Sequence, residues 1–219
     1  MSDELKRQAA LTALEEIRDG MIVGLGSGST ASIFIRELGK AGLKVLGIPT
    51  SEESRRIAGE AGVRLTSFEE HPAIDVTVDG ADEVSPGLDL IKGLGGALVR
   101  EKIVAHASKR VVIIVDEGKL VQKLGLKTAI PVEVIPLAVP GVLLQLKGAR
   151  IREKDGRVFI SDNGNLILDW KHGAIDDPAA LEKQLKAMTG VVDSGIFAGV
   201  AKCVIVAGLT GIRKENRKF

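Results

Sequence analysis

Short apolar runs alternate with amphipathic segments along the first half of the chain. The apolar runs predict strands at 21–24, 44–48, 63–65, 75–78 and 111–115. Apolar side chains recur at helical spacing between these runs, and they predict helices at 3–18, 29–41, 51–61 and 97–106. Because strand and helix alternate, we expect a mainly parallel sheet with helices on both faces.

The pattern changes at about residue 127, where prolines and short strands replace the regular alternation. Strands are predicted at 132–135, 149–152, 158–160 and 166–169. Lys154-Asp155-Gly156 has the chemistry of a hairpin turn, and Asp177-Pro178 opens a predicted helix. We expect a small α+β domain here. The apolar run 202–209 is then predicted to return to the main sheet, and the basic tail 213–218 to be solvated.

Candidate chemistry is concentrated in the segment 74–105. An apolar strand leads directly into Asp79, Asp82 and Glu83, and a glycine cluster with Lys92 follows before a helix that contains Glu101. In a parallel α/β sheet, ligands bind beyond the carboxyl ends of the strands. Carboxylates at that edge suit sugar hydroxyls, because they accept several hydrogen bonds. From the residues alone, an Asx-type turn and a helix-surface glutamate explain part of the pattern equally well.

A second glycine-rich segment, Gly24-Leu25-Gly26-Ser27-Gly28-Ser29-Thr30, lies between a strand and a helix. Exposed N–H groups and the helix dipole favour an anion at such a position. The segment matches neither a Walker loop nor the spacing of a dinucleotide-binding loop. A structural turn with Ser29 as the helix N-cap remains the alternative.

Composition narrows the function classes. The formal net charge is +1 and aromatic residues make up 3%, which argues against a nucleic-acid surface. No apolar run reaches the roughly 18 residues of a membrane span, and the mixed charges of residues 1–17 are unlike a signal or transit peptide. The single cysteine, Cys203, allows no disulfide within the chain, so we expect a cytoplasmic protein. The three histidines have no metal-ligand spacing.

Five segments together resemble one family. GLGSGST, VDGADE, IKGLGGALVREKIVA, PVEVIP and SDNGNLILD are similar, in this order, to the signature segments of type A ribose-5-phosphate isomerases. The resemblance implies a Rossmann-like α/β catalytic domain at 1–127, to which 203–219 returns, and a small α+β domain at 128–202. It also implies interconversion of D-ribose 5-phosphate and D-ribulose 5-phosphate in the non-oxidative pentose phosphate pathway, without metal or organic cofactor, by a homodimer or homotetramer.

The resemblance also assigns roles to residues. Glu101 matches the general base that acts through a cis-enediolate, Asp79 is expected to assist opening of the furanose ring beside Asp82, and Lys92 to stabilise negative charge. Leu94 stands where glycine is expected in many relatives, and Glu83 matches the motif without an assigned role. The residues expected to bind substrate are Lys6, Ser27, Gly28, Ser29, Thr30, Asp79, Gly80, Ala81, Asp82, Lys92, Gly93, Leu94, Gly95 and Lys119.

Two other interpretations stay open at this point. Coenzyme A transferases and glucosamine-6-phosphate deaminases have a related architecture, and a transferase would use a glutamate as its nucleophile. The carboxylates of VDGADE favour a polyol ligand instead. A non-catalytic sugar-phosphate sensor is the third possibility, although no helix-turn-helix region precedes Met21.

Overall fold

The structure is a computed structural model that describes residues 3–217. It divides into two compact units, and each is described below by itself. The first unit comprises Met1–Ala81, Arg100–Lys119 and Val200–Phe219, and the second comprises Asp82–Val99 and Leu120–Gly199. In the described part of the chain, every helix is too short or too polar to cross a bilayer.

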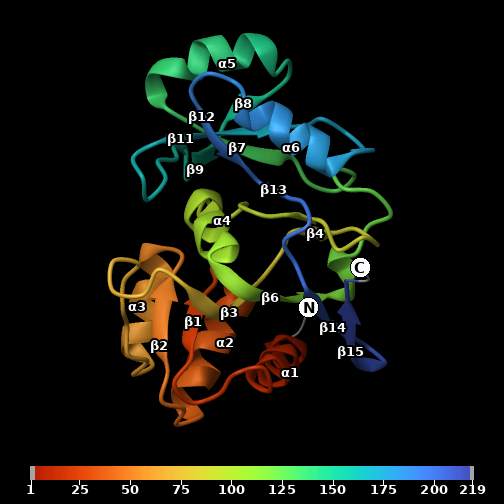
Figure 1. Cartoon of the computed structure of the whole chain (residues 1–219). Helices are drawn as coiled ribbons and strands as arrows, with labels where there is room; N and C mark the ends of the chain where they lie inside the picture. Colours follow the sequence, from red (N-terminus) through yellow and green to blue (C-terminus); the bar gives the residue numbers. More distant parts are fainter. Residues whose placement is uncertain (1–2, 218–219) are drawn as a thin grey trace. The chain divides into compact units, whose positions relative to one another are not determined.

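The first unit is built on one six-stranded sheet (Figure 1). The order across the sheet is β15-β14-β6-β3-β1-β2. Neighbouring strands are parallel except for β15, which runs antiparallel to β14 at one edge. The strands are β1 (Ile22–Leu25), β2 (Leu46–Pro49), β3 (Ile74–Asp79), β6 (Ser108–Asp116), β14 (Cys203–Gly208) and β15 (Gly211–Asn216).

Helices cover both faces of this sheet. One core joins α1, α2 and α3 to Val23 and Leu25 of β1 and to alternate residues of the neighbouring strands. On the opposite face, Val104 of α4 packs against Ile48 and Ile74. The predicted α/β architecture, a mainly parallel sheet with helices on both faces, is therefore confirmed. The helices of this unit are α1 (Asp3–Leu14), α2 (Ser29–Lys40), α3 (Glu52–Glu60), α4 (Leu98–His106) and the short 3₁₀ helix η1 (Glu117–Lys119).

One sequence expectation for this unit is wrong. The run 63–65 forms only an isolated bridge between Leu65 and Gly47 rather than a strand. The basic tail was predicted to be solvated, and the structure adds that Gly211–Asn216 forms β15 and pairs along β14. Its charged side chains do remain largely exposed, and charges on an edge strand discourage pairing with other chains. Lys218, the last residue of the predicted tail, lies outside the described residues.

The second unit is made of small antiparallel sheets. One has the order β12-β7-β11-β8, another β13-β5-β4, and β9 pairs with β10 alone. The segment Asp82–Val99 belongs to this unit because β4 and β5 pair with each other and β5 pairs with β13. The strands are β4 (Glu83–Val84), β5 (Leu90–Ile91), β7 (Ile130–Val134), β8 (Arg150–Ile151), β9 (Glu153–Lys154), β10 (Arg157–Val158), β11 (Leu166–Trp170), β12 (Val191–Ser194) and β13 (Ile196–Phe197).

Local sequence signals explain the turns and helix starts of the second unit. Asp155 and Gly156 both have positive φ (52° and 73°) between β9 and β10, as a two-residue hairpin turn requires. Asp177 caps its helix by accepting the N–H of Ala180. The core lies between the four-stranded sheet and the helices, which are η2 (Pro136–Ala138), α5 (Val139–Gln145) and α6 (Pro178–Lys186).

Candidate active site

Asp79 ends the central strand β3 and is fixed by backbone donors. Its Oδ1 accepts the N–H of Ser27 at 3.0 Å and the N–H of Gly80 at 2.7 Å, and only 2% of the residue is exposed. A Cβ on Gly26 would lie 2.2 Å from this oxygen and 2.6 Å from the Asp79 Cα. Gly26 is therefore required by the Asp79 carboxylate itself.

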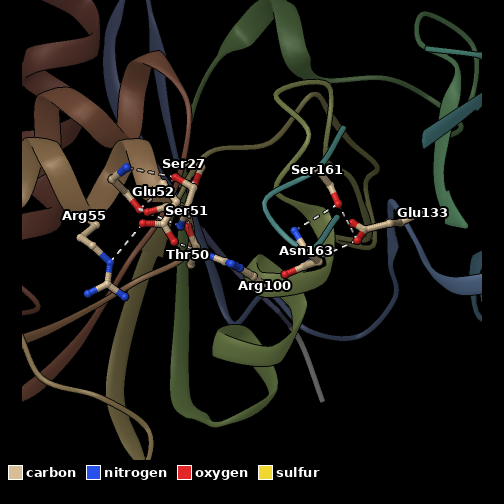
Figure 2. A network of polar contacts seen from close by, with 10 residues as sticks. Ser27, Thr50, Ser51, Glu52, Arg55, Arg100, Glu133, Ser161 and Asn163 are labelled. Atoms are coloured by element: carbon tan, nitrogen blue, oxygen red, sulfur yellow. Dashed lines mark hydrogen bonds and ion pairs between the residues drawn. The ribbon is translucent and has the colours of Figure 1, made fainter. Parts of the chain in front are cut away.

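Ser27 connects this carboxylate to a chain of hydroxyl groups (Figure 2). Its Oγ lies 2.7 Å from Thr50 Oγ1 and 2.8 Å from Ser51 Oγ. Thr50 also donates to the carbonyl of Leu25, and Ser51 caps α3 in a capping box with Ser54. The loops after β1 and β2 are thus joined by side chains, so the conformation of Ser27 is set before any ligand binds.

The loop after β1 ends at the start of α2. Gly28 is the N-cap, with φ 91°, and Ser29 and Thr30 lie in the first turn. The alternative in which Ser29 caps the helix is therefore wrong. Ser29 is exposed and Thr30 is half-buried. Free N–H groups of a first helical turn and two hydroxyls suit a phosphate.

Glu101 lies in the first turn of α4 and is 4% exposed, so it is not the surface charge that its Arg-Glu-Lys context allows. Val104, one turn further on, fills the space beside Gly24 on the face that also carries Thr77. Side chains alternate along a strand, so Asp79 lies on the same face as Thr77. The helix runs antiparallel to the strands, which brings Glu101 to the carboxyl end of that face.

Arg100 and Lys102, which flank Glu101, differ in their surroundings. Arg100 Nη1 donates to Glu52 Oε1 at 2.6 Å, and this hydrogen bond holds the pKa of Glu52 below its usual range (Figure 2). Lys102 is only 4% exposed, which the sequence pattern did not indicate. The ion pair ties the first turn of α4 to the start of α3.

The two predicted site lysines of the first unit, Lys6 and Lys119, also lie toward the carboxyl edge of the sheet. Lys119 is in η1, directly after β6, and is half-buried. Lys6 lies in the first half of α1, whose end leads to the amino end of β1, so the start of this helix points toward the carboxyl edge. The structure therefore groups Lys6, Lys119, Asp79 and Glu101 at one edge.

Ala81 belongs to the first unit, and the remaining predicted residues, which begin at Asp82, belong to the second. Asp82 donates its N–H to Ile91 O at 2.8 Å, and its Oδ2 accepts the N–H of Leu94 at 3.0 Å. Lys92 is 3% exposed, and its Nζ lies 5.6 Å from the centroid of the Phe197 ring. Lys92 is therefore not a solvated loop lysine. Among the described non-glycine residues only Leu88 and Asp155 have positive φ, so a leucine fits the backbone at Leu94.

Glu83 is the third carboxylate of VDGADE, and it is an anchor of the second unit. It is fully buried and accepts the N–H groups of Gly125, Lys127 and Thr128, at 2.6, 2.7 and 2.6 Å. The Thr128 hydroxyl adds a fourth bond. These contacts fix the loop 125–128 against β4.

Sequence reasoning missed two buried polar groups of the second unit. Glu133 Oε1 accepts hydrogen bonds from Ser161 at 2.9 Å and Asn163 at 3.0 Å (Figure 2). It accepts a third from Asn165 at 2.9 Å. Arg152 joins Asp169 to the carbonyls of the glycine loop. The signal was present, because SDNGNLILD contributed to the family resemblance, but no spacing rule pointed to these partners. Among the described residues, no group of three His, Cys, Asp or Glu side chains is arranged to hold a metal ion.

Comparison with known proteins shows the family. The model of the family described as ribose 5-phosphate isomerase A (phosphoriboisomerase A) matches residues 46–211. The chain belongs to this family. The ribose-5-phosphate isomerase A of Bradyrhizobium diazoefficiens is 49% identical, covering 99% of this chain and 97% of that protein. Its counterpart from Methanothermobacter thermautotrophicus is 50% identical, covering 95% and 96%.

Solved structures of the family agree with this fold. A D-ribose-5-phosphate isomerase in complex with phospho-erythronic acid has a TM-score of 0.96 at 42% identity, covering 99% of this chain and all of the other. The ribose 5-phosphate isomerase of Plasmodium falciparum has a TM-score of 0.93 at 38% identity, with full coverage of both chains. The family resemblance of the five sequence segments is therefore confirmed.

Proposed function

We propose that this chain interconverts D-ribose 5-phosphate and D-ribulose 5-phosphate by proton transfer, with no metal or organic cofactor. Membership of the family over nearly the whole chain supports the reaction. The observation that supports the mechanism is Glu101, a buried carboxylate on the same face and at the same edge of the sheet as Asp79. One carboxylate suffices, because C1 and C2 of the sugar are adjacent and the proton leaves and returns on one side.

The phosphate is proposed to bind at the start of α2. Ser27, Gly28, Ser29 and Thr30 supply hydroxyl and N–H donors there. The positive end of the helix dipole favours an anion. Lys6 and Lys119 lie toward the same edge and add positive charge. The phospho-erythronic acid bound by a similar isomerase is itself a sugar-acid phosphate, which agrees with a site for a phosphorylated polyol.

Ring opening is assigned to Asp79, with Gly80 and Ala81 beside it and Asp82 next along the chain. The two N–H donors of Ser27 and Gly80 hold the Asp79 carboxylate in one orientation. A carboxylate fixed in this way can accept the proton of the anomeric hydroxyl as the ring C–O bond breaks, and then return that proton to the former ring oxygen. Asp82 is proposed to bind sugar hydroxyls.

Isomerisation then follows at Glu101. It removes the proton from C2 of the open aldehyde, and a cis-enediolate forms as the C1 carbonyl accepts the electrons. The O2 proton moves to O1, and Glu101 returns its proton to C1. Positioned acid–base catalysis contributes about 10² to 10⁴-fold. Lys92 and the N–H groups of Gly93 and Gly95 are proposed to stabilise the enediolate oxygens, while the N–H of Leu94 donates to Asp82 Oδ2.

The proposal includes a homodimer or homotetramer that works in the cytoplasm. Support comes from large apolar side chains that are exposed on the second unit, above all Leu137 at 92% and Leu144 at 79%. Light scattering after size exclusion should give two or four times the chain mass of 23.1 kDa. A monomer would contradict this part.

Conversion of ribose 5-phosphate in D₂O with excess EDTA tests the chemistry. Proton NMR should show ribulose 5-phosphate with deuterium at C1, because the enediolate is reprotonated from a carboxyl group that exchanges with solvent. Product without deuterium would indicate a hydride shift. If no aldose phosphate is converted but ribose 5-phosphate raises the melting temperature, the chain binds without isomerising, as the sensor hypothesis requires.

A further inference from the structure

Arg152 is a buried arginine of the second unit that joins a carboxylate to the glycine loop. It follows β8 and is 9% exposed. Its Nε donates to Asp169 Oδ2 at 2.9 Å, and its Nη2 pairs with Asp169 Oδ1. Its Nη1 donates to Gly93 O at 2.7 Å and to Leu94 O at 3.0 Å. The bidentate pair neutralises and orients the guanidinium, and this leaves Nη1 directed at the loop.

These two carbonyl contacts determine where the loop N–H groups point. In a planar trans peptide the C=O of one residue and the N–H of the next point in opposite directions. Because Gly93 O points at Arg152, the N–H of Leu94 points away, and it does bond to Asp82 Oδ2 at 3.0 Å. Leu94 O also accepts a hydrogen bond from Arg152. By the same geometry, the N–H of Gly95 points away from the guanidinium.

The packing around residues 93–96 limits the backbone conformations that this loop can adopt. Gly93 and Gly96 have φ of +95° and +90°, a region that only glycine adopts readily, and Gly96 donates its N–H to Gly93 O at 3.0 Å. A Cβ on Gly96 would lie 2.3 Å from the Phe159 ring. Phe159 in turn donates its N–H to Arg152 O at 2.9 Å, and its ring lies 6.0 Å from the guanidinium.

We infer that Arg152, held by Asp169, is a positioning residue for the isomerisation. It binds the outward-facing carbonyls of Gly93 and Leu94 so that the N–H of Gly95 is presented to an oxygen of the substrate. The proposal rests on the proposed function, in which this loop stabilises the enediolate. It adds a residue that touches no substrate and acts only through the backbone. A lysine cannot replace it, because a single ammonium lacks the planar fork that reaches a carboxylate and two carbonyls together.

Arg152→Gln and Arg152→Lys test the inference against Arg150→Gln, which removes an exposed arginine two residues earlier. Loss of an aligned oxyanion donor lowers turnover, so kcat should fall about 10 to 100-fold in both Arg152 variants while KM changes less than about threefold. Arg150→Gln should match the unsubstituted protein. Added guanidinium at non-denaturing concentration should restore part of the kcat of Arg152→Ala.

Amide exchange gives a second readout that does not depend on turnover. Exchange at Leu94 and Gly96 should become faster in Arg152→Lys and Arg152→Gln, relative to the amides of β7 in the same molecules. Unchanged exchange, or a kcat within twofold in the folded variants, would overturn the inference while leaving the isomerase activity in place. An unsubstituted protein that turns over no aldose phosphate would instead remove the proposed function, and the exchange result would still decide whether Arg152 orders the loop.

Discussion

Asp79 and Glu83, two acidic residues of one short motif, are both buried but are bound by different kinds of partners. Oδ1 of Asp79 accepts the N–H groups of Ser27 and Gly80, which follow two parallel strands of the first unit. Both oxygens of Glu83 accept hydrogen bonds, four in all, from one loop of the second unit. The sequence presents them alike, four positions apart. These hydrogen-bond partners suggest that Asp79 takes part in the reaction, whereas Glu83 stabilises the fold of the second unit.

The largest expected effect is the loss of kcat on substitution of Glu101. This loss is the reference value for a carboxylate that takes part in the reaction. Glu101→Gln should lower kcat by about 10² to 10⁴-fold, because an amide cannot accept the C2 proton. Ribose 5-phosphate should still bind and raise the melting temperature. Glu53→Gln, in the equivalent first turn of α3 and exposed, is the matched control and should keep its turnover. Near-normal turnover of Glu101→Gln would remove this residue from the mechanism.

Glu83→Gln should mainly affect stability. The new amide group would face backbone N–H donors in a site with no exposure, so we expect a loss of about 2 to 4 kcal/mol in the free energy of unfolding. Urea unfolding followed by circular dichroism measures it, with exposed Glu153→Gln as the control. An unchanged midpoint would show that the four hydrogen bonds do not anchor the loop, and the comparison with Asp79 would fail.

Asp79→Asn should mainly affect activity rather than stability. Asparagine keeps an oxygen that can accept the N–H groups of Ser27 and Gly80, so the unfolding free energy should change by less than about 1 kcal/mol. The charge is lost, and kcat/KM should fall about 10 to 100-fold. Asp19→Asn is the control, because Asp19 also accepts a backbone N–H, that of Lys44, but near the amino ends of the strands. A variant that is destabilised yet fully active would reverse the assignment.

The smallest effect is expected at Asp75, at the other end of the same strand. Its hydrogen bond with Lys109 and the N–H of Ile22 lower its pKa. A carboxylate with a lowered folded pKa stabilises the fold above its unfolded pKa of about 4, and this contribution is lost as the pH falls toward the folded value. Asp75→Asn should cost about 0.5 to 1 kcal/mol at pH 7, because Lys109 is exposed.

A double-mutant cycle would isolate the contribution of this ion pair to the free energy of unfolding. It compares Asp75→Asn, Lys109→Gln and the double variant at pH 7 and at pH 3. The coupling should be present at pH 7 and smaller at pH 3. A coupling that stays constant between the two pH values would mean that the lowered pKa contributes nothing to stability.

The sequence by itself determined the features that depend on near neighbours. The helix start at Asp177 and the Asp155-Gly156 turn were predicted correctly, because each satisfies backbone groups within a few residues. The apolar runs predicted the central strands for a similar reason, since a strand buried on both faces needs apolar side chains throughout.

The tertiary structure alone decided which partners distant residues meet. Nothing in the charged run Gly211–Asn216 indicates a strand, because its pairing with β14 supplies the order. Glu83 and Glu101 look like surface charges in sequence, yet both are buried. Arg152 reaches a loop about 60 positions earlier, so no local pattern could have assigned it. Such contacts depend on how the chain closes on itself, and local sequence does not encode that.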